Sequence, residues 1–241
     1  MTNALTVDVE DFFQVTAFEK SISRNDWDGF PLRVGDNTRR ILDLLDSCQV
    51  RATFFVLGWV AERLPQLVRD IVARGHELAC HGHGHQLLHH LGPEGFREDL
   101  RRSKGVLESI AGRPVHGYRA PSYSITSTTL WALDILIEQG FTYDSSIFPV
   151  HHDIYGLPGS PRFPYLIRRA SGEIKEFPLT TWKLPFPGRD LLLPAAGGGY
   201  LRLLPVRFIH HVFSQINSRD DQPAVLYFHP WEIDPGQPRI K

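Results

Sequence analysis

The sequence predicts an α/β fold, a distorted (β/α) barrel with about seven parallel strands. Short runs rich in β-branched and aromatic residues alternate with amphipathic segments along the chain, which is the pattern of parallel strands joined by helical crossovers. The segment 51–57 is almost entirely apolar and is typical of a strand buried on both faces. An open doubly wound sheet is the alternative. Six or seven such units favour a barrel, within a single domain over residues 1–241.

The expected elements follow one another in a regular order. Strands are predicted over 4–9, 51–57, 77–80, 115–118, 141–143, 174–177 and 224–228. Asp36 or Asn37 is suited to cap the first helix, Pro65 to begin the next one and Gly75 to end it. Further helices are predicted over 93–110, 127–139 and 203–216. The Pro- and Gly-rich segment 183–200 is expected to be a long loop.

The composition excludes several classes of protein. With 42% hydrophobic and 22% charged residues, it is that of a globular chain with a core. A formal net charge of -1 gives no electrostatic basis for binding nucleic acid or an anionic membrane. No apolar run is long enough to span a membrane, and no secretory leader is recognisable, so we expect a cytoplasmic protein. No helical pattern follows the last strand, so the C-terminus is expected to be truncated. The sequence makes no prediction of oligomeric state.

Polar side chains suited to chemistry follow the predicted strands where each strand ends. They are Asp8, Glu10 and Asp11 after the first, His81 and His85 after the third, Arg119 after the fourth, Asp144 after the fifth and His229 after the seventh. In a parallel barrel the C-terminal ends of the strands form one face, and that face carries the catalytic groups. The sequence therefore predicts one site built from all of these segments.

The histidines are concentrated in one stretch. Six of the twelve lie within 76–90, and His81 and His85 are four residues apart directly after a strand. Imidazole is the commonest metal ligand, and this spacing lets two rings reach one ion. A solvated polar loop is the plainer alternative. His83, between the pair, is either a substitute ligand or a substrate contact.

The acidic cluster near the N-terminus supplies the carboxylates that such a metal needs. Asp8 and Glu10 are two residues apart on a strand, so their side chains point to the same face. Two histidines and one carboxylate make a common hydrolytic metal site, and a second carboxylate is then free to accept a proton from water. Arg119 is expected to orient a carboxylate such as Asp8 through charge-assisted hydrogen bonds. The alternative is that the acids only cap the turn after the strand.

Two further residues have alternative interpretations. His229 is either a packed core histidine or a general acid that protonates a leaving group. Asp144 either caps a turn or orients His229.

Five strings of the sequence, in order, carry a family resemblance. They are Leu-Thr-Val-Asp-Val-Glu-Asp (5–11), Gly-His-Glu-Leu-Ala-Cys-His-Gly-His-Gly-His (75–85), Tyr-Arg-Ala-Pro-Ser-Tyr (118–123), Tyr-Asp-Ser-Ser (143–146) and Leu-Tyr-Phe-His-Pro-Trp-Glu (226–232). This set resembles the five motifs of the polysaccharide deacetylase family, also called NodB-homology or carbohydrate esterase proteins. The Asp-Val-Glu-Asp-Phe start, the Gly-Gly-Gly-Tyr loop and the His-Pro-Trp-Glu end look like the branch found with exosortase-linked exopolysaccharide gene clusters.

The resemblance implies a seven-stranded barrel that binds a divalent metal, usually zinc. It assigns His81 and His85 as metal ligands, Arg119 as the holder of the catalytic carboxylate and His229 as the general acid. It assigns Asp144 as the residue that tunes that histidine. Ser122 matches the position whose backbone N–H stabilises the oxyanion, and Tyr123 adjoins it on the substrate side.

The carboxylate roles stay open at this stage. The common family pattern has adjacent acids, base then ligand, which would make Glu10 the base and Asp11 the ligand. A peptidoglycan deacetylase branch uses Asp-x-Asp, which would make Asp8 the base and Glu10 the ligand. We favour Asp8 as the base, and the metal carboxylate is Glu10 or Asp11.

The resemblance therefore implies hydrolysis of N-acetyl groups on an N-acetylated oligo- or polysaccharide, within exopolysaccharide biosynthesis. With such a substrate, Tyr200, Trp182 and Trp231 are available to stack on sugar rings. Two alternatives remain: an allantoinase-like amidohydrolase that acts on a small cyclic amide, and a catalytically inactive carbohydrate-binding barrel.

Overall fold

One curled sheet forms the centre of the computed structural model, which describes residues 1–152, 155–187, 189–195 and 197–239. Its strands are β1 (Ala4–Val9), β2 (Thr53–Val56), β3 (Glu77–Cys80), β4 (Gly117–Tyr118), β5 (Tyr143–Asp144), β6 (Tyr165–Arg169), β7 (Gly172–Glu176) and β10 (Val225–Phe228). They lie in the order β10-β1-β2-β3-β4-β5-β7-β6. All neighbours are parallel except β6 and β7, so the α/β fold with about seven parallel strands is confirmed. The sheet is a half-barrel with edges at β10 and β6.

The strand register brings the C-terminal ends of the central strands together. One residue of each strand lies in a single row across β1 to β5: Val9, Val56, Cys80, Tyr118 and Asp144. Glu10, His81 and Arg119 each follow a member of this row directly. They therefore emerge from one rim of the sheet, as the parallel arrangement predicts.

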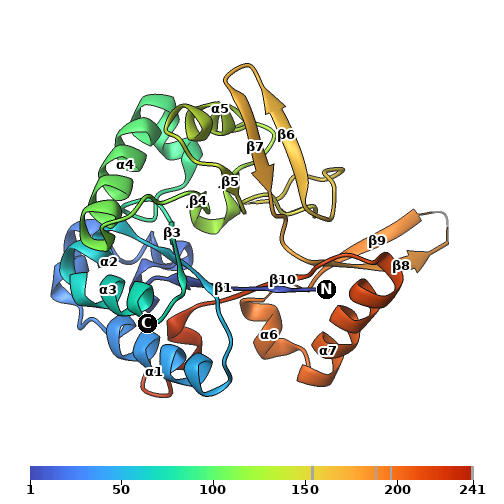
Figure 1. Cartoon of the computed structure of the whole chain (residues 1–241), viewed down its shortest axis with the longest axis horizontal. Helices are drawn as coiled ribbons and strands as arrows, with labels where there is room; N and C mark the ends of the chain where they lie inside the picture. Colours follow the sequence, from blue (N-terminus) through green and yellow to red (C-terminus); the bar gives the residue numbers. More distant parts are fainter. Residues whose placement is uncertain (153–154, 188, 196, 240–241) are drawn as a thin grey trace.

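Helices cover the outer face of the curled sheet (Figure 1). They are α1 (Val34–Ser47), α2 (Gly58–Arg63), α3 (Pro65–Ala73), α4 (Leu88–Ala111) and α5 (Trp131–Glu138). Pro65 begins α3, and Gly75 follows its end with a φ of 77°, both as predicted. In α4 the backbone is non-helical at Gly92 and Gly112 ends the helix, which agrees with the predicted helix over 93–110. The apolar faces of these helices and strands form one large core.

The start of α1 differs from the prediction. The helix begins at Val34, before Asp36 and Asn37, and its N-cap residue Arg33 provides no side-chain cap. Instead Asp11 Oδ2 accepts the backbone N–H groups of Arg33 and Val34 at 2.7 and 2.8 Å. Free N–H groups at a helix start need an acceptor, and here a residue from a distant loop supplies it. A cap of this kind leaves no local signal in the helix sequence.

The segment expected to be a long loop contains a β-hairpin. β8 (Thr181–Phe186) and β9 (Arg189–Pro194) pair antiparallel as a separate two-stranded sheet. They are followed by α6 (Gly199–Leu203) and α7 (Val206–Gln215), and Trp182 packs edge-on against Phe208 of α7 at 5.1 Å. The loop prediction was wrong because a two-stranded hairpin has only edge strands, which tolerate proline: Pro185 lies within β8 and Pro194 ends β9. The edge strand β6, whose residues are half-buried or exposed, was also not predicted.

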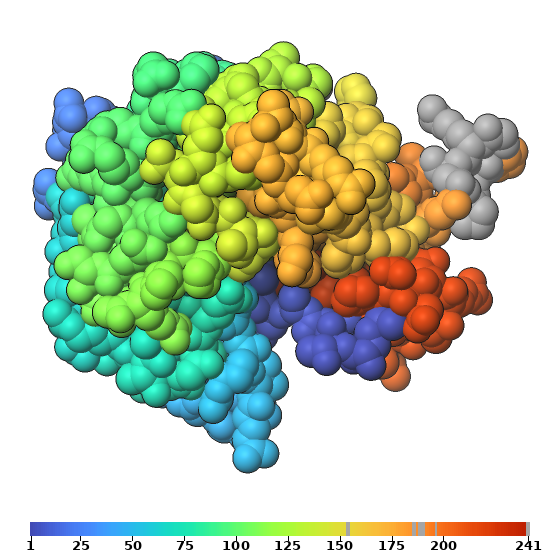
Figure 2. Space-filling view, turned by 45° about the horizontal axis from the view of Figure 1, so that its top comes forward, coloured from blue at the N-terminus to red at the C-terminus, as the bar shows by residue number. Residues whose placement is uncertain are grey.

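The N-terminal segment lies against the C-terminal part of the chain, as the neighbouring blue and red surfaces of Figure 2 show. Asn3 and Asn217 exchange side-chain hydrogen bonds at 2.8 and 2.9 Å. This contact joins the residues just before β1 to the segment that precedes β10. Among the described residues, no helix is long and apolar enough to cross a membrane.

Candidate metal and catalytic site

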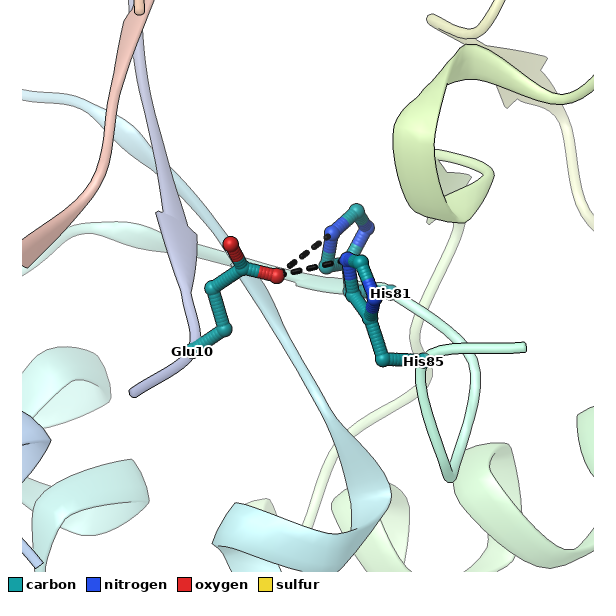
Figure 3. A group of neighbouring side chains, drawn as sticks. All are labelled: Glu10, His81 and His85. Atoms are coloured by element: carbon teal, nitrogen blue, oxygen red, sulfur yellow. Dashed lines mark ion pairs between the residues drawn. The ribbon is translucent and has the colours of Figure 1, made fainter. Parts of the chain in front are cut away.

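Glu10, His81 and His85 converge at the rim of the sheet, and their side chains point toward one another (Figure 3). Glu10 leaves the end of β1, and the two histidines come from the loop after β3. Glu10 Oε2 lies 2.6 Å from His85 Nε2 and 3.9 Å from His81 Nε2. All three side chains are at most 4% exposed. The structure therefore brings together the predicted histidine pair and one of the two candidate carboxylates.

The orientation of His81 suits a metal ligand. Its Nδ1–H donates to the backbone carbonyl of Arg119 at 2.8 Å, which leaves the lone pair of Nε2 directed at Glu10 and His85. Burial lowers the pKa of His81 to about 4, so the ring is neutral at neutral pH. Histidines that bind metals typically donate their other ring N–H to a backbone carbonyl or carboxylate, which fixes the tautomer. His85 has a left-handed backbone with a φ of 48°. Strained backbone conformations of this kind occur most often at functional sites.

The polar atoms of the three side chains are spaced for binding a divalent cation and are not satisfied by hydrogen bonds among themselves. His85 Nδ1 is buried without a hydrogen-bond partner among the described residues, and Glu10 Oε2 has no partner of regular geometry there, although it lies 2.6 Å from His85 Nε2. Two ligands about 2.0 Å from a tetrahedral metal are about 3.3 Å apart, and the two distances from Glu10 Oε2 lie on either side of that value. Burial raises the pKa of Glu10, but the imidazoles of His85, His229 and His81 outweigh it and lower the pKa to about 2. The carboxylate is thus ionised, as a metal ligand must be.

Asp11 lies outside this cluster. Its side chain accepts three backbone N–H groups, those of Phe12, Arg33 and Val34, and it has no exposed surface. A carboxylate that already satisfies a turn and a helix start has no oxygen left to direct at the histidines. Of the two carboxylates that the sequence left open, the geometry therefore brings Glu10 to the candidate metal site and uses Asp11 as a cap.

Asp8 and Arg119 form a buried ion pair beside the metal cluster. Arg119 Nη1 donates to Asp8 Oδ1 at 2.6 Å and to Thr6 Oγ1 at 2.8 Å. The guanidinium also donates to the backbone carbonyl and the hydroxyl of Ser145. Tyr123 donates its hydroxyl to Asp8 Oδ2 at 3.3 Å. The predicted pairing of Arg119 with Asp8 is present, and both oxygens of the carboxylate have a fixed orientation.

His229 reaches the same site from β10. Its Nε2 lies 3.6 Å from Glu10 Oε1, and Trp231 donates its indole N–H to that oxygen at 3.3 Å. The rings of His229 and Trp231 are stacked, with centroids 4.7 Å apart. Burial lowers the pKa of His229, but its hydrogen bond to Glu232 and the charges of Glu10 and Asp8 outweigh it, so the pKa is raised. A raised pKa favours the protonated ring that a general acid requires.

The expected contact between Asp144 and His229 is absent from the structure. The Nδ1–H of His229 donates to Glu232 Oε1 at 2.6 Å. Asp144 instead accepts from the hydroxyl of Ser146 at 2.5 Å and interacts with the buried carboxyl of Glu176. Sequence reasoning missed Glu232 as a site residue, although a His-x-x-Glu spacing after a strand was available as a signal.

Ser122 and Tyr123 form a tight turn that faces the site. Both have left-handed backbones, with φ of 49° and 53°. The N–H of Tyr123 donates to the carbonyl of Ala120, whereas the N–H of Ser122 makes no hydrogen bond to a described residue. The Ser122 hydroxyl contacts Thr16 Oγ1 at 2.6 Å. The Ser122 N–H is thus the better candidate for an oxyanion donor.

One cavity of about 290 Å³ joins these groups. Among the residues that line it are Asp8, Glu10, His81, His85, Ser122, Tyr123, Tyr155, His229 and Trp231. Of the three aromatic residues expected to stack on sugars, only Trp231 lines this cavity; Trp182 packs on α7. His83 points elsewhere, with Nε2 3.2 Å from Glu62 Oε1, so it does not join the candidate metal cluster.

Comparison with protein families finds two models that match successive parts of the chain. The polysaccharide deacetylase model matches residues 26–143, and a model described as "Domain of unknown function (DUF3473)" matches residues 145–241. Residues 26–143 of the chain are thus similar to the polysaccharide deacetylase family. The first match includes His81, His85 and Arg119, and the second includes His229 and Glu232. Glu10 and Asp8 precede both, so their place in the site rests on the geometry.

Individual relatives agree with this family. The chain is 31% identical over 160 residues to the peptidoglycan deacetylase-like protein FGM2 of Gibberella zeae, which is 66% of this chain and 44% of that protein. It is 37% identical over 100 residues to a chitooligosaccharide deacetylase of Sinorhizobium fredii, 41% of this chain and 44% of the relative. The chain thus spans less than half the length of these two relatives. A putative polysaccharide deacetylase from Mycobacterium smegmatis has a TM-score of 0.65 at 26% identity, over 95% of this chain and 76% of that one.

The fold alone extends to proteins of other activity. Puue allantoinase has a TM-score of 0.63 at 17% identity, over 94% of this chain and 76% of that one. BA3943 of Bacillus anthracis, a CE4 family pseudoenzyme, has a TM-score of 0.52 at 14% identity, over 95% and 54%. The fold alone therefore does not determine the activity, which depends on the side chains in the cavity.

Proposed function

We propose that this chain hydrolyses N-acetyl groups of an amino-sugar oligo- or polysaccharide with the help of a bound divalent metal. The observation that carries the proposal is the content of one cavity: a cluster suited to a metal, a carboxylate held by a buried arginine, and a histidine paired with a glutamate. The names of the relatives support acetylated saccharides as the substrate class.

Glu10, His81 and His85 would hold the metal, with Zn²⁺ as the first candidate because two histidines and one carboxylate are a common catalytic zinc set. When bound, such an ion polarises the acetyl carbonyl and makes a water more acidic. The protein's own part is to present three buried ligands with fixed orientation, and the Arg119 carbonyl that holds His81 contributes to this.

Asp8 acts as the general base in this proposal. It lines the cavity, and Arg119 and Tyr123 hold its two oxygens in place. A base held in this way can accept a proton from a water in the cavity without first reorganising. Glu10 is less suited to the role because its carboxylate faces the two histidines.

His229 supplies the proton that the departing amine needs. A free amide anion is a very poor leaving group, so a protonated acid at this position is essential. The cavity position and the raised pKa of His229 support this role. Ser122 lines the cavity and its N–H makes no hydrogen bond to a described residue, so this N–H would stabilise the negative oxygen that forms during attack on the carbonyl.

A second cavity supports an oligomeric substrate over a small amide. It measures about 610 Å³ and shares Thr16 and Tyr155 with the catalytic cavity. Hydroxyls of Thr126, Ser127 and Thr128 line it, and such groups are suited to hydrogen bonding with sugars. Its size corresponds to further sugar units beyond the one that reacts. We also propose, on the sequence resemblance, a step in exopolysaccharide biosynthesis.

Acetate release from acetylated chitooligosaccharides by the metal-loaded protein tests the proposal. We expect acetate and a matching amount of free amine, and loss of both in His81→Ala. Ring opening of allantoin without acetate release would favour an amidohydrolase. Binding of the oligosaccharides without turnover of any substrate would favour an inactive carbohydrate-binding protein. Either result would contradict the proposal.

A further inference from the structure

We propose that Glu232, and not Asp144, is the positioning residue of His229. The carboxylate that orients this histidine then lies in the turn after β10 and not at the end of β5. The inference rests on the proposed function, in which His229 is the proton donor. It concerns the partner of that histidine, which the family resemblance assigns to Asp144.

The contact between Glu232 and His229 is short, partly buried and local. His229 Nδ1 lies 2.6 Å from Glu232 Oε1, and the two side chains are 15% and 5% exposed. The chain forms a short 3-10 helix over Pro230–Ile233, in which the N–H of Glu232 donates to the carbonyl of His229 at 3.0 Å. This turn places side chains three residues apart on the same side, so the pairing follows from the His-x-x-Glu spacing itself.

Asp144 makes its hydrogen bonds to Ser146 and not to His229. Its Oδ1 accepts from the Ser146 hydroxyl at 2.5 Å and its Oδ2 from the Ser146 N–H at 3.3 Å. The neighbouring carboxyl of Glu176 accepts the N–H of Ile147 at 3.0 Å. In the sheet, four strands separate β5 from β10. The acid that the resemblance assigns to His229 therefore supports the segment after β5.

That segment serves the other half of the site. Ser146 Oγ accepts the N–H of Ala120 at 2.8 Å, and Ser145 accepts from Arg119 through both its hydroxyl and its carbonyl. Asp144 thus acts on the loop that holds Arg119, while Glu232 acts on His229. The two acids have separate tasks, and the pairing with Glu232 is independent of β5.

The pairing with Glu232 determines which nitrogen of His229 faces the substrate. A carboxylate at Nδ1 keeps a proton on that nitrogen, so Nε2 is the atom that gives and receives the mobile proton. Nε2 points to the cavity, 3.6 Å from Glu10 Oε1. Stacking on Trp231, whose ring centroid also lies 5.3 Å from the Arg202 guanidinium, further limits rotation of the His229 ring.

A matched pair of isosteric variants, Glu232→Gln and Asp144→Asn, tests the inference by NMR. The readout is the ring Nδ1–H resonance of His229 in the zinc-loaded protein, assigned through loss of that signal in His229→Gln. We expect a clear upfield shift in Glu232→Gln, since a neutral amide replaces a charged acceptor, and no shift in Asp144→Asn. A shift in Asp144→Asn with none in Glu232→Gln would overturn the inference.

Kinetics provide the second readout. In Glu232→Gln we expect kcat to fall about 10- to 100-fold with KM nearly unchanged, because the substrate contacts remain and only the proton donor is misoriented. Glu232→Asp should recover part of kcat. Equal thermal midpoints would show that the loss is not due to unfolding, and an unchanged kcat in Glu232→Gln would contradict the inference. If no acetylated saccharide is a substrate but the NMR shift occurs, the proposed function fails and the His229–Glu232 assignment stands.

Discussion

Arg119 and Asp8 meet through a hydrogen bond of 2.6 Å in the interior, where the arginine has no exposed surface and the aspartate is 2% exposed. Arg119 also donates to Thr6 and Ser145, and its guanidinium lies 4.1 Å from the ring of Phe55. A buried charge pair with this many partners specifies one arrangement of β1, β4 and the loop after β5. It links the stability of the sheet to the orientation of the proposed base.

The first prediction concerns this pair. Lysine keeps the charge but cannot reproduce the planar set of donors, so Arg119→Lys should leave the Ser145 acceptors unpaired. We expect the free energy of unfolding to fall by about 2–4 kcal/mol and the rate of acetate release to fall at least about 100-fold. Denaturant unfolding and the acetate assay measure the two effects.

The exposed Arg101 provides the matched control. Its side chain is 73% exposed and pairs with Glu98 on the surface of α4. Arg101→Lys should change stability by no more than about 0.5 kcal/mol and leave the rate unchanged. Similar losses in both variants would show that the buried pair has no special role.

The second prediction separates the adjacent acids Glu10 and Asp11. Glu10→Gln should abolish tight metal binding because the amide is a poor ligand for the ion, and should change stability little. Asp11→Asn should keep the metal but lower the free energy of unfolding by about 1–2 kcal/mol through the weakened start of α1. Metal content after dialysis and denaturant unfolding give the two answers. Loss of metal in Asp11→Asn alone would reverse the assignment.

The third prediction concerns pH and the buried pair Asp144 and Glu176. Burial raises the pKa of Asp144 to about 6, and burial together with the neighbouring Asp144 carboxylate raises the pKa of Glu176. Both acids bind protons more tightly in the folded state than in the unfolded one. Their contribution to stability is therefore complete below about pH 4 and is lost as the pH rises through 6.

Glu176→Gln should reduce this loss of stability. Between pH 4 and pH 7.5 we expect the free energy of unfolding to fall less in the variant than in the original chain, by on the order of 1–3 kcal/mol. Glu173, exposed on the same strand and paired with Arg168, is the control. The pair would be irrelevant to pH dependence if Glu176→Gln and Glu173→Gln gave the same profile.

The fourth prediction addresses the second cavity. Thr128 lines it and is exposed, so Thr128→Trp should obstruct the cavity without disturbing the core. We expect kcat/KM for acetylated tetra- and pentasaccharides to fall about 10-fold, with little change for a disaccharide that fits the catalytic cavity alone. The disaccharide is the internal control. An equal loss for all lengths would place the substrate elsewhere.

Much of the fold was predictable because the parallel strands are apolar runs with polar residues directly after them. Because the C-terminal ends of parallel strands meet at one edge, the sequence alone predicted that Glu10, His81, Arg119 and His229 lie at one rim of the sheet. β8 and β9 were not predictable, because an isolated hairpin near proline residues has no buried periodic pattern.

The missing parts of the site have a common physical cause. Asp11 and Glu10 are neighbours in sequence, and only the position of a distant helix start shows which of them is a cap. Glu232 acts within its own turn, outside the set of strand ends from which catalytic groups were predicted. Tertiary capping and local turns thus decided the roles that the strand pattern left open.

Titration of Zn²⁺ into the metal-stripped protein, with the initial rate of acetate release from an acetylated chitotetraose as the readout, tests the central claim most directly. The account predicts a rate that rises linearly to one equivalent of metal and then stays constant, and no rise in Glu10→Gln. Acetate release that is independent of added metal, or no acetate at any metal content, would contradict it.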